Sequence, residues 1–366
     1  MNRADAFRHP QTVSHLMTQI EHTITQPWTL MEICGGQTHA FLKSGLDQLL
    51  PSEITLIHGP GCPVCVTPIA IIDQAIELAA RDDVVLCSFG DMLRVPGSEE
   101  TLMQQKTLGA EVKILYSPLD AITLAQKLPE KQIVFFSVGF ETTAPTSALL
   151  VQRAAKLHLN NLSLLVSHVR VPPALEMILS APDNQVQGVM AAGHVCTVMG
   201  TDEYLPLANK YRTPIVVTGF EAVDLLLGVY RTITQLEQGR FEVDNAYSRY
   251  VKAAGNPTAK ALLNKVFDSV NMEWRGFGSV PSGGLQLSSD YQRFDASQRF
   301  SLQKKSVIPL KPCRSAEILT GKIKPEECGL FANGCSPSNP AGAPMVSTEG
   351  VCHAYYQYSS RKQVAS

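Results

Sequence analysis

The sequence predicts an α/β protein built on parallel sheets, and three observations support this fold class. From residue 30 to about residue 230, short apolar runs rich in β-branched residues alternate with segments of helical length and three-to-four periodicity. Such alternation is typical of parallel strands covered by helices. Cysteine, histidine and acidic residues recur directly after the apolar runs, at the edge where open parallel sheets bind ligands. The 366 residues suffice for two or three domains.

Eight apolar runs are predicted to be buried strands, and in order they cover residues 30–34, 54–58, 84–89, 112–116, 132–138, 162–168, 186–192 and 214–218. Helical periodicity between them predicts helices at 69–80, 119–128, 143–157 and 221–236. A further helix is expected at 257–270. The glycine-rich stretch W-R-G-F-G-S-V-P-S-G-G follows it and is typical of turns.

The predicted organisation is two α/β domains, at residues 1–145 and 146–240, followed by a helical and loop-rich region at 241–366. The tripeptide G-F-E follows a predicted strand twice, at 139–141 and 219–221, which hints at two related halves. Near the C-terminus, four cysteines lie among many prolines and glycines. Such a segment can hardly form an apolar core, so we expect another kind of bond to hold it.

Composition excludes several classes of function. The net charge of -2 does not favour nucleic acid or an anionic membrane surface as a partner. The N-terminus lacks the apolar segment of a secretory signal, and the longest apolar runs have only strand length. We therefore expect a cytoplasmic protein. In a reducing compartment, nine cysteines are more typical of metal binding or redox activity than of structural disulfides.

Cys34 is the first candidate site residue, in the sequence C-G-G-Q-T-H. It ends a predicted strand and precedes a helix, so backbone N–H groups are expected to lower its pKa and favour the thiolate. The two glycines allow the backbone to approach a bulky ligand, and His39 is near in sequence. A buried inert cysteine is the alternative, which these neighbours disfavour. A nucleotide site is unsupported, because no phosphate-loop pattern is present.

Cys62 and Cys65 form a C-x-x-C motif within H-G-P-G-C-P-V-C-V-T-P. This spacing suits either a redox-active pair or two ligands of one metal ion. A tetrahedral zinc site would need a second C-x-x-C, and the chain has none. The motif alone does not choose between a disulfide and a metal site.

Four cysteines near the C-terminus predict a four-thiolate site. Cys313, Cys328, Cys335 and Cys352 are separated by fourteen, six and sixteen residues. The paired C-x-x-C hooks that zinc normally uses are missing, so the irregular spacing favours a [4Fe–4S] cluster over zinc. Scattered free thiols are the third interpretation.

Three further residues have two interpretations each, and two isolated cysteines are considered after them. His168 and His194 follow predicted strands and are either hydrogen-bonded core residues or functional groups. Glu141 is expected to favour a helix N-terminus, with a functional role as the alternative. Cys87 is interpreted as a core residue, and Cys196 remains open.

The chain resembles the HypD family of hydrogenase formation factors in long and unusual motifs that occur in order along nearly its whole length. These motifs are C-G-G-Q-T-H, G-P-G-C-P-V-C-V-T-P, F-G-D-M-L-R-V-P-G, G-F-E-T-T-A-P-T, L-T-G-K-I-K-P-E-E-C-G-L-F and M-V-S-T-E-G-V-C-H-A-Y-Y. The resemblance implies two Rossmann-like α/β domains and a third region that carries a [4Fe–4S] cluster.

The resemblance also implies a function in the maturation of [NiFe]-hydrogenase. Proteins of this family act with the small chaperone HypC as a scaffold on which the Fe(CN)2CO unit is assembled. HypE delivers the cyanide ligands, and the finished unit passes to the hydrogenase large subunit. The implied cofactors are the [4Fe–4S] cluster and, during assembly, the iron unit itself.

The motifs that match assign roles by resemblance. Cys34 is expected to hold the iron together with a thiolate of HypC. Cys62 and Cys65 match the redox-active pair, and the four C-terminal cysteines match the cluster ligands. A cluster that feeds this pair, which in turn serves the iron, would form a short relay. His39 is the last residue of C-G-G-Q-T-H, Glu141 lies in G-F-E-T-T, and His194 lies in A-G-H-V-C, where the family usually reads P-x-H-V-S. All three are included as candidate catalytic residues.

Two residues depart from the family pattern. Gln37 stands where histidine is usual, and it can form hydrogen bonds but cannot titrate. Cys196 stands where serine is usual and could add a thiol to the site. Two other functions remain as alternatives to the scaffold. One is a free-standing thiol–disulfide oxidoreductase with a structural C-terminal metal site, and the other is a nucleotide-dependent α/β enzyme.

Overall fold

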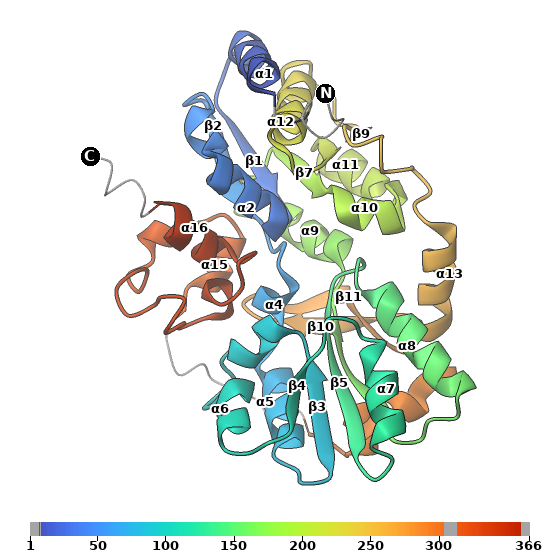
Figure 1. Cartoon of the computed structure of the whole chain (residues 1–366). Coiled ribbons are helices and arrows are strands. Elements are labelled where there is room, and N and C mark those ends of the chain that lie inside the picture. The colour runs from blue at the N-terminus through green and yellow to red at the C-terminus, as the bar shows by residue number, and fades with distance from the viewer. Residues whose placement is uncertain (1–6, 8, 304–312, 360–366) are drawn as a thin grey trace.

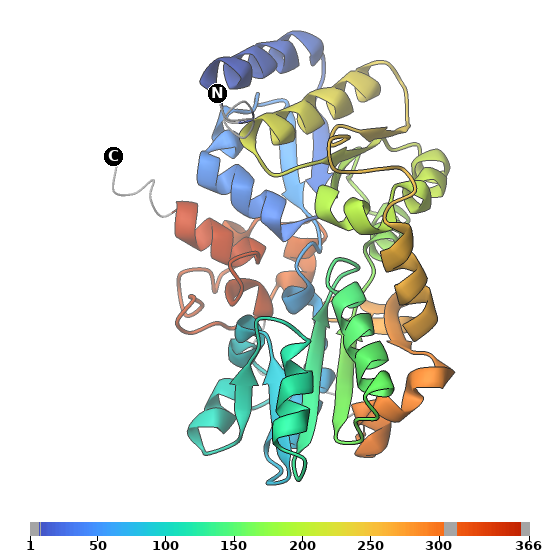
Figure 2. The ribbon, with the colours of Figure 1, turned by 45° about the vertical axis from the view of Figure 1, so that its right-hand side comes forward.

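The computed structural model describes residues 7, 9–303 and 313–359, and it contains two parallel sheets flanked by helices (Figures 1 and 2). The first sheet has the order β2-β1-β7-β8-β9, and the second has the order β4-β3-β5-β6. Every neighbouring pair in both sheets is parallel. The prediction of an α/β fold with two Rossmann-like domains is therefore confirmed.

The strands of the first sheet are β1 (Trp28–Glu32), β2 (Ile54–His58), β7 (Gly188–Ala192), β8 (Ile215–Thr218) and β9 (Val243–Asn245). Those of the second are β3 (Val84–Ser88), β4 (Val112–Ile114), β5 (Gln132–Gly139) and β6 (Leu162–His168). All eight predicted strands exist. They could be recognised because each is a short apolar run; all but the edge strand β4 are mostly buried in the middle of a layered fold.

The helices, in chain order, are α1 (Pro10–Thr23), α2 (Gly35–Ser44), α3 (Leu46–Leu49), α4 (Pro63–Val66), α5 (Ile69–Ala79), α6 (Leu102–Thr107), α7 (Asp120–Lys127), α8 (Ala144–Lys156), α9 (Val171–Leu179), α10 (Gly193–Met199), α11 (Leu205–Tyr211), α12 (Ala222–Glu237), α13 (Pro257–Val266), α14 (Ala296–Arg299), α15 (Ser315–Leu319) and α16 (Val351–Ser359). Within the described ranges, none of these helices combines the length and the hydrophobicity that a bilayer crossing requires.

The strands are not divided between the sheets at residue 145. The chain leaves the first sheet after β2, builds the whole second sheet, and returns to the first at β7. Leu30 of β1 pairs with Gly188 of β7, so the first sheet joins distant parts of the chain. A boundary at 145 would separate the paired strands β5 and β6, so the predicted division of the chain at residue 145 does not coincide with the division into sheets.

The predicted helix at 257–270 is also corrected. It begins as expected, with the Asn256 side chain accepting a hydrogen bond from the N–H of Ala259, but it ends at Val266. Phe267 has extended backbone angles and starts β10 (Phe267–Trp274). This strand pairs antiparallel with β11 (Gly278–Leu287) in a hairpin between the two sheets (Figure 1). The glycine-rich stretch is the tip and second strand of that hairpin.

His168 is a satisfied core histidine in the second sheet. Its Nε2 lies 2.9 Å from Ser137 Oγ and 3.1 Å from Ser147 Oγ, and its Nδ1 lies 3.2 Å from the carbonyl oxygen of Gly139. The side chain is fully buried, and burial lowers its pKa to about 4. Of the two interpretations of His168, the structure supports the hydrogen-bonded core residue.

We predict that His168 makes the fold sensitive to acid. Because its pKa in the folded state is depressed, only the unfolded state binds the proton as pH falls from about 6.5 towards 4. Stability is therefore retained above pH 6.5 and is lost below it, by about 1.4 kcal/mol per pH unit and by roughly 3 kcal/mol in total. Denaturant midpoints at pH 7.5 and pH 5, compared between the wild type and His168→Gln, would measure this loss, because both proteins share all other titrating groups. His168→Gln should flatten the profile, and an unchanged slope would contradict the assignment.

Candidate metal and redox centre

The three groups of cysteines converge where the C-terminal segment packs beside the junction of the two sheets (Figures 1 and 2). Cys34 follows β1 and opens α2, while the C-x-x-C motif follows β2 and contributes to α4. Helix α16 packs against α2, and the short helix η6 (Ala343–Met345) packs against α4. Parallel pairing of β1 with β2 brings the ends of both strands to the same edge.

The chain approaches itself very closely at Cys34. The N–H of Gly35 donates to the carbonyl oxygen of Gly61 at 3.0 Å. A Cβ atom on Gly61 would lie 2.3 Å from both the Cα and the N of Cys34. A Cβ on Gly35 would lie 2.1 Å from the carbonyl oxygen of Glu349, which belongs to the C-terminal segment. Glycine at these two positions therefore allows three segments to meet at one thiol.

Cys34 itself is buried and has one close polar side-chain neighbour at its sulfur. Its Sγ lies 3.7 Å from Nδ1 of His194, which stands in the first turn of α10. Burial lowers the pKa of His194 to about 4, so this imidazole is neutral at physiological pH. The aromatic ring of Phe220 packs against His194 and Gly36, so an apolar side chain lies beside both the imidazole and the first turn of α2.

The expected low pKa of Cys34 is wrong for the protein without bound metal. The predicted N–H groups are present, since the amides of Gln37 and Gly36 lower the pKa. Burial raises the pKa more than these N–H groups lower it, and the charge of Glu32 raises it further. The pKa of Cys34 therefore lies well above its usual range. A bound cation would reverse this balance, because a coordinating thiol loses its proton.

A buried network that the sequence did not predict supports Cys34. Glu32 accepts hydrogen bonds from the N–H of Cys34 at 2.8 Å, from His58 Nδ1 at 2.7 Å and from the hydroxyl of Thr38. His58 Nε2 lies 3.0 Å from the hydroxyl of Tyr355 on α16. A fully buried glutamate needs such partners. The sequence feature that could have indicated this network is the glutamate inside the otherwise apolar run L-M-E-I-C.

Cys62 and Cys65 are joined by a disulfide, which answers the question that the motif left open. Cys62 precedes Pro63, the first residue of α4, and the N–H of Cys65 points back at the Cys62 sulfur over 3.2 Å. Both residues are almost completely buried, in the same core cluster as Cys34. Cys328 and Cys352 pack against the edge of that cluster.

The four C-terminal cysteines are brought together around one small cavity of about 20 Å3. Cys313, Cys328, Cys335 and Cys352 all line it, alongside apolar side chains that include Phe331. The N–H of Ala341 donates to the sulfur of Cys335 at 3.3 Å. Burial raises the pKa of Cys352, and the other three thiols raise it further. Across the described part of the chain, no three cysteine, histidine or acidic side chains are arranged to hold a single metal ion.

The other candidate residues lie in different settings. His39 is held by the C-terminal segment, with Nδ1 3.3 Å from the carbonyl oxygen of Thr348 and Nε2 3.1 Å from the hydroxyl of Tyr358. Cys87 is fully buried in the core of the second sheet, and burial raises its pKa to about 12. Cys196 is buried on α10, two residues after His194.

Glu141 and Gln37 each leave one buried oxygen atom without a partner. Glu141 does not cap its own helix; its Oε1 accepts the N–H of Val171, the first residue of α9, at 2.9 Å. Burial raises the pKa of Glu141 to about 7. Gln37 donates through Nε2 to the carbonyl oxygens of Ala191 and Thr218, both at 3.2 Å, so it ties α2 to the ends of β7 and β8.

Comparison with known proteins gives a consistent result. A family model for HypD, described as "Hydrogenase formation hypA family", matches residues 11–359. The hydrogenase maturation factor HypD of Azotobacter vinelandii is 44% identical over 372 residues, which cover 99% of this chain and 98% of the relative. The protein of the same name from Escherichia coli K12 is 44% identical over 374 residues, with all of both chains covered. That from Rhodobacter capsulatus is 41% identical over 374 residues.

Proposed function

The chain belongs to the HypD family of hydrogenase maturation factors, and from this premise we propose that it is the scaffold for assembly of the Fe(CN)2CO unit of [NiFe]-hydrogenase. One observation carries the proposal. A buried thiol, a disulfide and a four-cysteine cavity occupy contiguous parts of a single centre, although they come from opposite ends of the chain.

Cys34 is proposed to hold the iron of the unit, which is the substrate of the assembly. Iron with cyanide and carbonyl ligands is soft and suits a thiolate ligand. Cys34 becomes anionic when the metal binds, and the neutral His194 imidazole at 3.7 Å can take up or return the thiol proton. HypC is proposed to supply a second thiolate, and HypE to bring the cyanide groups.

The four C-terminal cysteines fit a [4Fe–4S] cluster. Soft thiolates converge on one cavity, and an N–H group points at the Cys335 sulfur. Apart from Arg314, which pairs with Glu317, the other lining residues are apolar, as suits a cluster site. The thiols surround a space instead of meeting at one point, which suits a polynuclear group better than a zinc ion. When bound, the cluster would supply single electrons.

Cys62 and Cys65 are proposed to be the redox-active pair. Opening their bond takes two electrons and two protons and produces two thiols beside Cys34. These electrons would arrive one at a time, in two successive transfers from the proposed cluster. The pair is buried, so another protein's thiolate could not reach the sulfurs without rearrangement. This burial disfavours the free-standing thiol–disulfide oxidoreductase. The remaining free thiols suit a reducing compartment, and we propose the cytoplasm.

Metal analysis of the anaerobically purified protein tests this assignment. We expect iron and acid-labile sulfide in equal amounts and little zinc. Cys328→Ala should remove the visible absorption of the cluster and block hydrogenase maturation, because it deletes one of four ligands. Cys87→Ala is the matched control, since Cys87 is a buried cysteine remote from this cavity, and it should retain both. Zinc without sulfide in the unaltered protein would contradict the proposal.

A further inference from the structure

The tip of the β10–β11 hairpin lies between α4, which carries Cys65 of the disulfide, and the four-cysteine segment at residues 313–352. The N–H of Arg275 donates to the carbonyl oxygen of Val66, the last residue of α4, at 2.8 Å. The next residue, Gly276, has a φ of +88° and packs against α15, where a Cβ would lie 3.2 Å from Ala316. The backbone at Arg275 is therefore held on one side by Val66, which follows Cys65 in the chain, and on the other by α15, which begins two residues after Cys313.

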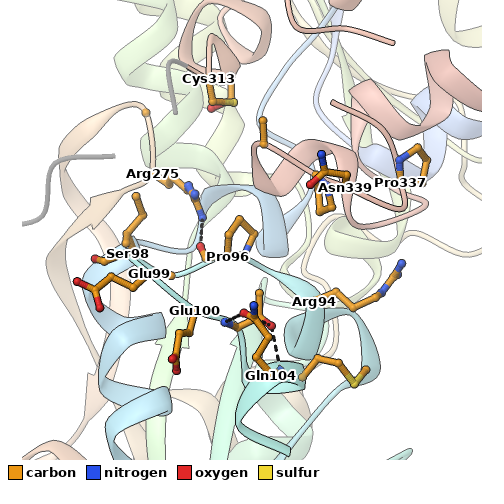
Figure 3. Close-up of a pocket in the computed structure, with 18 of the residues that line it drawn as sticks. Arg94, Pro96, Ser98, Glu99, Glu100, Gln104, Arg275, Cys313, Pro337 and Asn339 are labelled. Carbon is orange, nitrogen blue, oxygen red and sulfur yellow. Dashed lines mark hydrogen bonds between the residues drawn. The ribbon is translucent and has the colours of Figure 1, made fainter. Parts of the chain in front are cut away.

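The Arg275 side chain faces a cavity of about 490 Å3 that Cys313 also lines, as Figure 3 shows. Its guanidinium Nη1 donates to the carbonyl oxygen of Pro96 at 3.2 Å. Burial lowers the pKa of the Arg275 guanidinium, and the neighbouring Cys313 and Asp73 oppose this effect. Asp73 is already engaged, because both of its carboxylate oxygens accept hydrogen bonds from Ser98.

Arg275 is a cation without a carboxylate partner. Among the residues that the structure describes, no acidic side chain lies within ion-pair distance of its guanidinium, although Glu99 and Glu100 line the same cavity. Arg94 lines this cavity too, but its Nη2 lies 3.1 Å from Asp91. Two arginines thus line the cavity that Cys313 also lines, and of the two only Arg275 keeps an uncompensated charge.

An uncompensated cation at this place has a direct electrostatic consequence. Four thiolates around a [4Fe–4S] cluster make an anionic group, and uptake of one electron adds a further negative charge. A fixed positive charge nearby stabilises the reduced form more than the oxidised form. Because arginine does not lose its proton in proteins, the effect holds at every physiological pH.

We propose that Arg275 is a positioning cation that raises the reduction potential of the cluster held by the four cysteines. The inference rests on the proposed function, because it requires a cluster at that place. The redox step is the transfer of one electron from a low-potential one-electron reductant to the oxidised cluster. Arg275 takes no part in bond making; it acts through its charge beside Cys313.

The test is an anaerobic spectroelectrochemical titration of the full chain, with dithionite as the one-electron reductant. Arg275→Met removes the charge while keeping an unbranched side chain, and we expect a clearly lower cluster potential. Arg275→Lys should keep most of the wild-type value. Arg94→Met is the matched control in the same cavity, and it should shift the potential much less because the Arg94 charge is already balanced by Asp91. An unchanged potential in Arg275→Met, or an equal shift in Arg94→Met, would overturn the proposal.

A second pair of variants applies if Arg275→Met does not retain its cluster. Ala316 is half-buried on the same cavity wall, so Ala316→Glu places a carboxylate near the intact arginine and Ala316→Gln is its uncharged control. A lower potential in the glutamate variant alone supports the proposal, and equal potentials overturn it. Absence of iron and sulfide from the wild-type protein would contradict the proposed function, whereas a cluster that is indifferent to these charges would contradict this inference alone.

Discussion

Cys34→Ser is expected to abolish hydrogenase maturation while leaving the fold and the four-cysteine cavity intact. The substitution keeps the size of the side chain but replaces a soft thiolate by a hydroxyl, which is a poor ligand for iron with cyanide and carbonyl ligands. Cys34 is the thiol on which the strand ends, the disulfide loop and the C-terminal segment converge. We therefore expect its loss not to be compensated by a neighbouring cysteine.

Complementation of a cell that lacks its own copy of this factor would measure the effect. We expect hydrogenase activity to fall by at least about a hundredfold, which corresponds to roughly 3 kcal/mol. The cluster absorption of the purified variant should remain, because its ligands lie elsewhere. Cys87→Ser is the control, and normal maturation by Cys34→Ser would exclude Cys34 as the iron ligand.

Gly61→Ala is expected to disrupt the centre through sterics alone. The added methyl group would lie 2.3 Å from the backbone of Cys34, a distance that requires one of the two segments to move. Overpacking of this kind costs roughly 1–3 kcal/mol or more, and here backbone must shift because no flexible side chain can give way. The displacement would carry Cys62 away from Cys34, so maturation should be lost even where the chain stays folded.

Thermal unfolding and complementation together test this prediction. Gly90→Ala is the matched control, because the nearest atom to its new methyl group would lie at 3.8 Å, an ordinary contact. It should leave both stability and maturation near wild type. A Gly61→Ala protein with wild-type stability and activity would show that the close approach of the two loops has no role.

Local sequence patterns predicted most of the fold. Each of the eight strands is a self-contained apolar run, and the C-terminal cysteines stood out by composition alone. The pairing of β1 with β7 could not be predicted, because it depends on contacts between distant segments rather than on either run. The hairpin at 267–287 was missed since F-D-S-V-N-M-E-W carries many polar residues, and only its pairing with β11 makes it a strand.

The sequence allowed the cysteines of the candidate centre to be predicted, but not the electrostatic effects of the residues around them. Glycines and strand ends around Cys34 indicated a functional thiol, but burial and the charge of Glu32 raise its pKa against the helix N–H groups. Both effects come from tertiary packing. No sequence pattern indicated a role for Arg275, because a single arginine in a glycine-rich turn is common. Its setting depends on tertiary structure, in which its N–H bonds to Val66 and its side chain lines a cavity together with Cys313.

An infrared spectrum of the anaerobic complex with HypC tests the central claim most directly. Cyanide and carbon monoxide bound to iron absorb where protein does not, so the cargo can be seen without interference. We expect both kinds of stretching band in the wild-type complex and neither in the complex of Cys34→Ser. A wild-type complex without these bands, or a serine variant that retains them, would contradict assembly of the iron unit on Cys34.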